Sequence, residues 1–105
     1  MSLPSRRSKL EAMLATAPGD QLLRYMLAME LDKNSENERS LELFDSLMSD
    51  STPYVPAFLM AGQQLARIGR TAEARDVYAT GIREAHAQGN AHAEGEMTGF
   101  LDSLA

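Results

Sequence analysis

The chain has 105 residues, a formal net charge of −5 and no cysteine. This length fits one domain with a modest core, and the acidic balance argues against a general nucleic-acid binder. The absence of cysteine excludes disulfide scaffolds and thiolate metal sites, and no apolar run approaches the about 20 residues of a membrane-spanning helix. We therefore expect neither nucleic acid nor a membrane among the partners.

The N-terminal segment predicts an amphipathic helix rather than a targeting peptide. Three basic side chains at residues 6–9 precede a short apolar stretch, which Glu11 interrupts almost at once. A secretory signal requires about 7–15 uninterrupted apolar residues. The apolar side chains of residues 10–14 instead follow helical spacing. We expect the protein to be cytoplasmic.

Turn residues divide the whole chain into segments of helical period. Valine and isoleucine are scarce and no segment alternates with a period of two, so strands are not expected. Short loops between helices of this length favour antiparallel neighbours. The predicted helices cover residues 5–17, 21–33, 36–50, 53–68, 71–88 and 90–104.

Three of these helices have a recognisable start. Asp20 is the expected N-cap of the second helix. Ser35 and Glu38 have the spacing of a capping box at the start of the third. Thr52 is the expected N-cap of the fourth, with Pro53 at its first helical position, where the missing N–H has no cost.

Most of the negative charge lies in residues 30–50, which hold seven acidic and two basic side chains. One interpretation is a solvated helix face. The other is an acidic patch that steers a basic partner toward the protein. The sequence leaves both interpretations open.

The middle of the chain repeats with a period of 34 residues. The aligned pairs include Ala28 with Gly62, Leu31 with Leu65, Ser35 with Gly69, Ser40 with Ala74, and Phe44 with Tyr78. The same offset reaches the first helix, where Leu10 matches Phe44 and Met13 matches Leu47. Two helices approach closely only where side chains are small, so the recurring small residues mark predicted helix crossings.

A 34-residue period of paired helices resembles the tetratricopeptide repeat (TPR). Residues 55–88 are the best copy, and residues 21–54 are a more divergent one. In the best copy the matching residues are Phe58 at the family's tryptophan position, Gly62 and Ala74 at the helix crossing, Gly69 at the turn, and Tyr78 and Gly81 in the second helix. Residues 6–20 resemble the second half of a repeat, and residues 89–105 lack the pattern.

The resemblance implies an all-α fold, a right-handed α-α superhelix of antiparallel helix pairs. One domain would span residues 1–105, with about six helices. One hairpin cannot cover its own apolar face, so hairpins stack and terminal units are atypical. Residues 89–105 are therefore the expected C-terminal capping helix.

The second predicted helix carries two apolar stripes. Leu23, Leu27 and Leu31 form the stripe that the core should bury. The second stripe consists of Leu22, Tyr25, Met26 and Met29. In the family that this chain resembles, the first helix of each pair lines a concave groove for a peptide or protein segment. Carried onto this sequence, the candidate groove residues are Leu22, Tyr25, Met26, Met29, Lys33, Leu59, Met60, Gln63 and Arg67. Methionine is flexible and adapts to different apolar partners.

Three interpretations of the second stripe remain open. It binds a protein or peptide partner, it is covered within the chain by the terminal helices, or it joins two copies in a homodimer. One branch of the family binds a C-terminal carboxylate through lysine, asparagine and arginine on the first helices. Here Tyr25, Met29 and Met60 stand at such positions, which argues against that ligand.

The sequence predicts no enzymatic, metal or cofactor chemistry. The two histidines, His86 and His92, lie six residues apart across a Gly-Asn break, which fits no zinc motif. His92 and Glu96 have i, i+4 spacing, but two ligands make a poor metal site. We expect a non-catalytic protein-binding scaffold.

Overall fold

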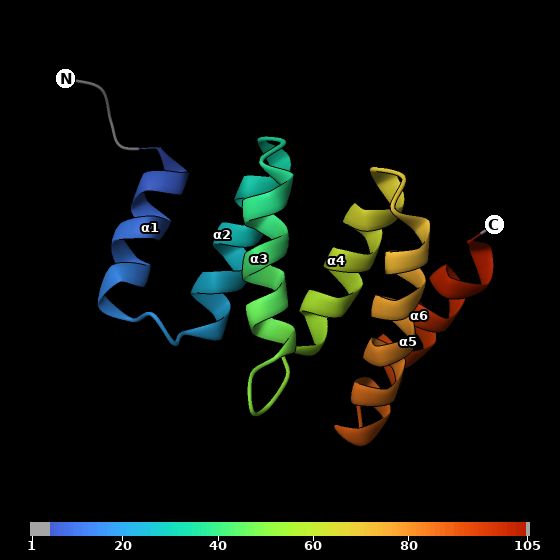
Figure 1. Ribbon diagram of the computed structural model, residues 1–105. Helices are drawn as coiled ribbons and strands as arrows, with labels where there is room; N and C mark the ends of the chain where they lie inside the picture. The colour runs from blue at the N-terminus through green and yellow to red at the C-terminus, as the bar shows by residue number, and fades with distance from the viewer. Residues whose placement is uncertain (1–4, 105) are drawn as a thin grey trace. The chain divides into compact units, whose positions relative to one another are not determined.

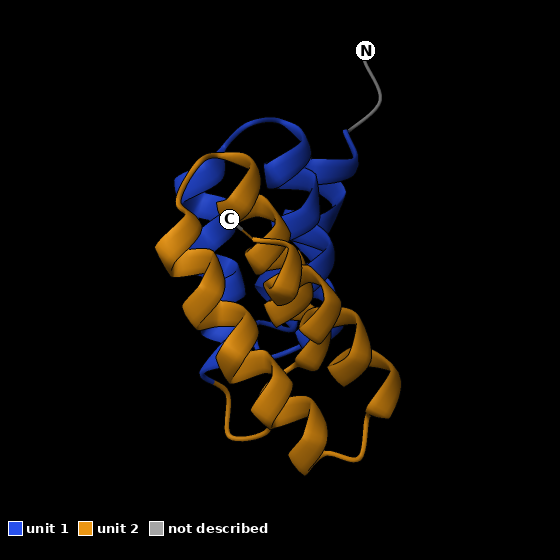
Figure 2. Ribbon diagram, turned by 90° about the vertical axis from the view of Figure 1, so that its right-hand side faces the viewer, with its two compact units in different colours: residues 1–49 blue, residues 50–105 orange. Residues whose placement is uncertain are grey.

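The computed structural model describes residues 5–104, which form six helices and no strand. The helices are α1 (Arg6–Thr16), α2 (Gln21–Lys33), α3 (Asn37–Met48), α4 (Val55–Arg67), α5 (Thr71–Ala87) and α6 (Ala91–Ser103) (Figure 1). They form two compact units, residues 1–49 with α1–α3 and residues 50–105 with α4–α6 (Figure 2). The expected all-α fold of six helices, with antiparallel neighbours inside each unit, is confirmed.

In the first unit, α2 packs against both α1 and α3. Leu10, Leu27 and Leu31 form the buried centre of this packing, and Leu23 lies partly buried beside them. The predicted core stripe of α2 is therefore confirmed. Leu10 is the buried residue of α1, so this helix contributes one fully enclosed side chain to the core.

In the second unit, α5 packs against both α4 and α6. The Tyr78 ring is buried on α5 and stacks on the Phe100 ring of α6, with centroids 6.0 Å apart. Phe58 of α4 and Met97 of α6 are buried on the same side of α5, where both lie against Gly81.

Small residues set the distance between paired helices, as the repeat pattern predicts. The Ser40 hydroxyl of α3 donates a hydrogen bond to the Ala28 carbonyl of α2 at 2.6 Å, with both residues buried. A Cβ on Gly62 would lie 2.3 Å from Cε1 of Tyr78, so that ring occupies the space a larger residue would need. These contacts are closer than any branched side chain permits.

The start of α2 is as predicted, whereas the start of α3 is not. Asp20 accepts a hydrogen bond from the Leu23 N–H at 2.9 Å. The capping box of Ser35 and Glu38 is wrong: the residue before α3 is Glu36, and its side chain makes no capping bond. Ser35 has φ of +62°, because it ends the turn after α2 instead of starting α3.

The start of α4 also differs from the prediction. The helix begins at Val55 with Tyr54 as the N-cap, and Pro56 rather than Pro53 lies in its first turn. The Pro53 carbonyl accepts a hydrogen bond from Nε2 of Gln88 at 2.8 Å. Either proline suits a first turn, so the local sequence could not distinguish them.

Three helix ends share one turn geometry. In each, an N–H beyond the helix donates to a carbonyl five residues earlier, which satisfies a helix-end acceptor. The donor–acceptor pairs are Glu36 with Leu31 at 2.9 Å, Arg70 with Leu65 at 2.8 Å, and Asn90 with Ala85 at 2.8 Å. The left-handed residue of each turn is Ser35, Gly69 or Gly89. Ser35 thus takes the left-handed position that glycine occupies in the other two turns.

Charged side chains hold α1 to α3. Arg7 pairs with Glu36, and Arg39 Nη2 lies 2.9 Å from Glu11 Oε1. Arg7 also approaches Glu11, with Nε 3.4 Å from Oε1. Desolvation pushes the pKa of Glu11 upward, but the hydrogen bonds from Arg39 and Arg7 and their charges outweigh it. The pKa of this carboxyl therefore lies below its ordinary value.

Replacing Ser35 with glycine should stabilise the fold. A non-glycine residue in the left-handed region costs about 1 kcal/mol, and Ser35→Gly removes that cost. We expect the free energy of unfolding to rise by roughly that amount in urea titrations, and Tm by about 4–8 °C. Ser46→Gly makes the same change inside α3 and should lower stability by about 0.5 kcal/mol. A destabilised Ser35→Gly variant would contradict the turn assignment.

Two glycine-to-alanine variants should have opposite effects. Gly62→Ala should destabilise by about 1–3 kcal/mol, because the new methyl group collides with the buried Tyr78 ring. Gly95→Ala on α6 meets nothing within 4 Å and should stabilise by about 1 kcal/mol through helix propensity. Denaturant unfolding of both variants measures the difference. If the two variants changed the free energy of unfolding equally, the contact with Tyr78 would not limit the size of residue 62.

The link between α1 and α3 should weaken in acid. Because the folded pKa of Glu11 lies below its ordinary value of 4.5, its contribution is present above that value and is lost as the pH falls through the folded pKa. Glu11→Gln should therefore lower stability at about pH 7, and the difference from the wild type should shrink toward pH 3. Glu42→Gln, on the exposed part of α3, is the matched control. A difference that persists in acid would assign the effect to packing.

Candidate functional site

The five predicted groove residues of the first unit lie along α2 and define the α2 face: Leu22, Tyr25, Met26, Met29 and Lys33. Leu22 is 56% exposed and Met29 is 38% exposed, although both are large apolar side chains. Tyr25 and Met26 are half-buried, and Lys33 is exposed. The Tyr25 ring meets the Phe44 ring of α3 edge-on, at a centroid distance of 6.2 Å.

The second apolar stripe of α2 is only partly covered within the first unit. Its members recur at helical spacing on one side of α2. Tyr25 meets Phe44 of α3, and Met26 packs against the core cluster of Leu10, Leu27 and Leu31, whereas Leu22 and Met29 are exposed. The adjacent stripe, with Leu27 and Leu31, is buried.

A pocket of about 380 Å³ lies between α1 and α2. Its lining residues are Arg6, Met26, Met29, Glu30 and Lys33. Arg6 Nε lies 3.4 Å from Glu30 Oε2, and this ion pair joins the two helices at the pocket. The volume is at the lower end of the range for small-ligand pockets, about 300–1,000 Å³.

Two of these lining residues, Arg6 and Glu30, were missed by the sequence analysis. The resemblance assigns groove residues to the first helix of a pair, whereas Arg6 belongs to the preceding helix. A signal was nevertheless present, because the 34-residue offset places Arg6 opposite Ser40. An arginine at a small crossing position indicates a surface that no regular neighbour covers.

The other four predicted groove residues lie in the second unit, on α4. Leu59, Met60 and Gln63 are half-buried and Arg67 is exposed. They share one side of α4 by helical spacing, while Phe58 and Leu65 are buried. We refer to Leu59, Met60, Gln63 and Arg67 as the α4 face.

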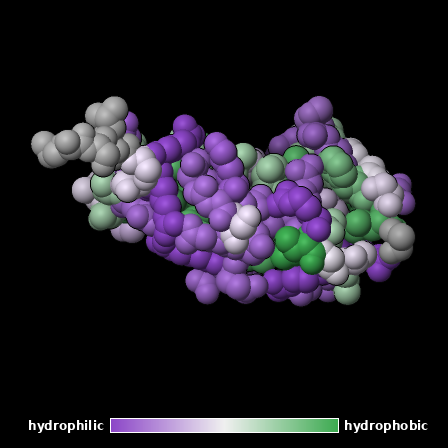
Figure 3. Space-filling model, turned by 90° about the horizontal axis from the view of Figure 1, so that it is seen from above, coloured by the Kyte–Doolittle hydropathy of each residue, from purple (hydrophilic) through white to green (hydrophobic). Residues whose placement is uncertain are grey.

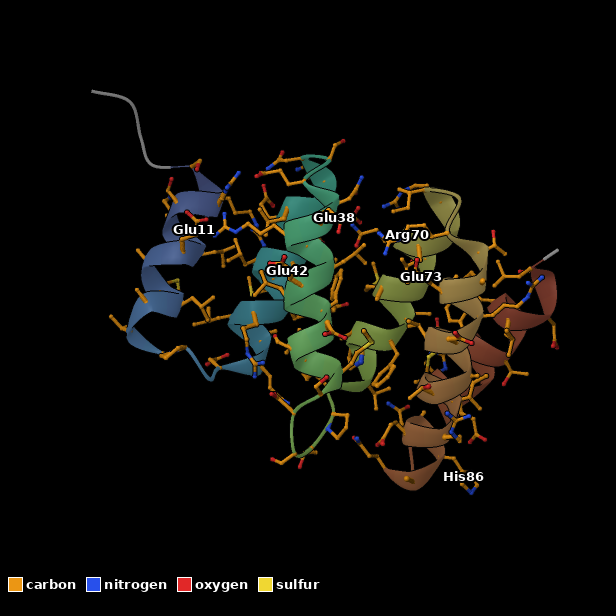
Figure 4. All side chains as sticks on the ribbon, in the orientation of Figure 1. Glu11, Glu38, Glu42, Arg70, Glu73 and His86 are labelled. Carbon is orange, nitrogen blue, oxygen red and sulfur yellow. The ribbon has the colours of Figure 1, made fainter. Side chains whose placement is uncertain are left out.

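The acidic stretch of residues 30–50 divides into two parts. Glu30 and Glu36 pair with arginines of α1, so the basic N-terminal helix is itself a partner of this stretch. Glu38, Glu42 and Asp45 are exposed along α3. Figure 4 labels Glu38 and Glu42 on that helix, and hydrophilic side chains dominate the face of the molecule drawn in Figure 3.

The histidines form pairs rather than a metal centre. His86 Nδ1 lies 3.3 Å from Glu94 Oε1, and His92 Nε2 lies 3.1 Å from Glu96 Oε1. Both histidines are largely exposed, and His86 is labelled near the end of α5 in Figure 4. Among residues 5–104, no three histidine, aspartate or glutamate side chains come together as a metal would require. No helix in that range is long and apolar enough to cross a membrane.

Comparisons with known proteins place the chain among relatives with the same repeat. No family model matches the sequence. The TPR repeat-containing protein PA0015 of Pseudomonas aeruginosa is 30% identical over 95 residues, which cover 90% of this chain and 90% of that protein.

Two solved structures are similar over most of their length. The solution structure of protein BPP2914 from Bordetella parapertussis has a TM-score of 0.80 and 27% identity, covering 97% of this chain and 89% of that one. The tetratricopeptide repeat domain protein from Salinibacter ruber has a TM-score of 0.77 and 32% identity, covering 83% of this chain and 88% of that one. The repeat period, the small residues at the helix crossings and these similarities agree: the chain belongs to the tetratricopeptide repeat family.

Proposed function

We propose that the protein binds a segment of a partner protein on the α2 face, without catalytic chemistry of its own. A tetratricopeptide-type fold suggests a protein–protein interaction module, and such repeats are generally non-catalytic. The finer proposal, that this particular face is the binding surface, rests on the side chains of α2. We expect binding to take place in the cytoplasm.

The exposure of Leu22 and Met29 is the observation that carries the proposal. Fully burying a side chain of this size contributes about 1.5–3 kcal/mol, of which the isolated unit gains only part because both side chains remain exposed. A partner that covers Leu22 and Met29 would add part of this burial energy to the free energy of binding. Met26 and Met29 are unbranched, so they can repack around apolar groups of different shape.

We propose the α4 face of the second unit as a further binding surface. Leu59 and Met60 supply apolar area, and Gln63 and Arg67 supply polar groups on the same side of α4. Support for this part comes from the shared repeat position of α2 and α4. Nothing in the comparisons favours the homodimer alternative, which the experiments below include as an outcome.

Charged substitutions on the α2 face should abolish partner binding and leave the fold intact. Leu22→Glu and Met29→Glu place a carboxylate where an apolar contact is expected, and both positions are exposed. We expect each variant to lower affinity for a captured partner by about tenfold or more, with Tm within a few degrees of the wild type. Capture from source lysate identifies the partner, and titration of the purified partner by calorimetry gives the affinity.

The matched control is Ala72→Glu, which adds the same charge at an exposed position of α5. It should leave affinity unchanged. Unchanged binding by both α2-face variants would contradict the proposal. Light scattering over a concentration series, with Tyr25→Lys as the comparison, tests self-association: a wild-type dimer that this substitution dissociates would replace the partner-binding proposal with the homodimer.

A further inference from the structure

The contact between α1 and the rest of the first unit is incompletely packed. Among the larger apolar side chains of α1, Leu10 is buried, Leu14 is half-buried and Met13 is 53% exposed. Open pockets of about 330 Å³ and 380 Å³ lie along this contact. The residues that line the smaller one are Glu11, Leu14, Ala15, Leu27 and Arg39. Dispersion contacts are lost where such space separates two surfaces, so the apolar attachment of α1 depends mainly on Leu10.

Ion pairs supply a second attachment, and most of their side chains are exposed. The pairs are Arg6 with Glu30 of α2, Arg7 with Glu36, and Glu11 with Arg39 of α3. These side chains are 33–63% exposed, except that of Glu30, which is 16% exposed. Salt screens exposed charges beyond about 10 Å at 0.1 M and about 3 Å at 1 M. The attachment of α1 is therefore sensitive to ionic strength.

The charges of α1 are also unfavourable for an isolated helix. Arg6, Arg7 and Lys9 lie at its start, where the helix dipole is positive, and its first turn holds no acidic residue. The Ser5 side chain caps the helix, but α1 has 11 residues, and isolated helices shorter than about 12–15 residues are marginal in water. The carboxylates that pair with the two arginines offset this repulsion while α1 is docked. Loss of those pairs therefore weakens the helix as well as its attachment.

We propose that α1 docks and folds in one reversible event that depends on its ion pairs, so that raised ionic strength releases it as an unfolded segment while α2 and α3 stay packed. The pairing of α2 with α3 has buried contacts of its own, including Phe44 and the Ser40 hydrogen bond to Ala28. Release of α1 uncovers part of Leu27, which lies in one cluster with Leu10. The apolar area of α2 thus responds to ionic strength, with or without a partner.

Amide hydrogen exchange of the full chain, followed by NMR at about 0.05 M and about 1 M NaCl, tests this proposal. We expect the α1 amides to exchange about tenfold faster or more at the higher salt, because three pairs, each contributing about two- to fivefold, are screened together. The matched control is α6, which is attached by the buried Met97 and the stacked Phe100 and should not accelerate.

Three results of the salt series would overturn the proposal. Unchanged α1 exchange would show that Leu10 and the helix itself hold α1 in place. Equal acceleration in α1, α2 and α3 would show a single cooperative unit. Unprotected α1 amides already at the lower salt would show that the ion pairs do not hold α1 at all.

Arg6→Glu separates docking from helix propensity, because the two predict opposite changes. A glutamate at the start of α1 favours the isolated helix, but it repels Glu30 across the contact. We expect α1 exchange to accelerate, and slower exchange would contradict dependence on the pairs. Lys9→Glu is the matched control, since it adds the same charge at an exposed position near the start of α1 and should leave exchange unchanged or slow it. Equal acceleration by both variants would also count against the proposal.

Reversal of the pair completes the test. Arg6→Glu combined with Glu30→Arg should recover most of the protection of α1 and its sensitivity to salt. Lack of recovery while α2 remains protected would assign the role of Arg6 to something other than the pair and overturn the proposal. Amides of α5 and α6 report whether each variant is folded, and the wild-type salt series decides the outcome if a variant is not.

Discussion

Close approach of paired helices at small residues is the constraint on which each unit depends. Gly62 lies under the Tyr78 ring, Gly81 lies against Phe58 and Met97, and Ser40 donates its hydroxyl hydrogen to the Ala28 carbonyl. At each contact the backbone of one helix meets a side chain or the backbone of its neighbour. Larger residues beside these positions, such as Leu31 and Phe44, fill the remaining space and are buried. The spacing of small residues therefore determines which face of each helix points inward and, by exclusion, which face remains for a partner.

The outermost described helices, α1 and α6, pack against their neighbours by different interactions. At the C-terminal end, α6 covers α5 with Met97 and stacks Phe100 on Tyr78. At the N-terminal end, α1 buries Leu10 alone and is tied to its neighbours by Arg6, Arg7 and Glu11. Exposed ion pairs are individually weak, about 0–1 kcal/mol, so α1 depends on several of them together. At this edge Met26 is half-buried and Met29 is exposed.

Met26, Met29 and Lys33 lie together on the α2 face and line one pocket with Arg6 and Glu30. The exposed part of α3 carries Glu38, Glu42 and Asp45, which favour water or a basic partner. The α2 face instead combines apolar area with a cation at its end.

The all-α fold, the helix count and the crossing residues could be predicted from the sequence, because helical period and small-residue spacing are local signals that recur every 34 positions. The start of α2 at Asp20 was equally local. The predicted start of α4 was wrong because Pro53 and Pro56 both suit a first helical turn. The predicted start of α3 was wrong because Ser35 adopts the left-handed conformation that ends the turn after α2, a role more typical of glycine. The α2 face was predicted from its second apolar stripe, but its exposure was not, because exposure depends on what neighbouring helices cover. The 34-residue offset marks Arg6 as unusual, but the pocket beside its ion pair with Glu30 was decided by tertiary structure, because the walls come from two helices and their packing brings the two side chains to one place.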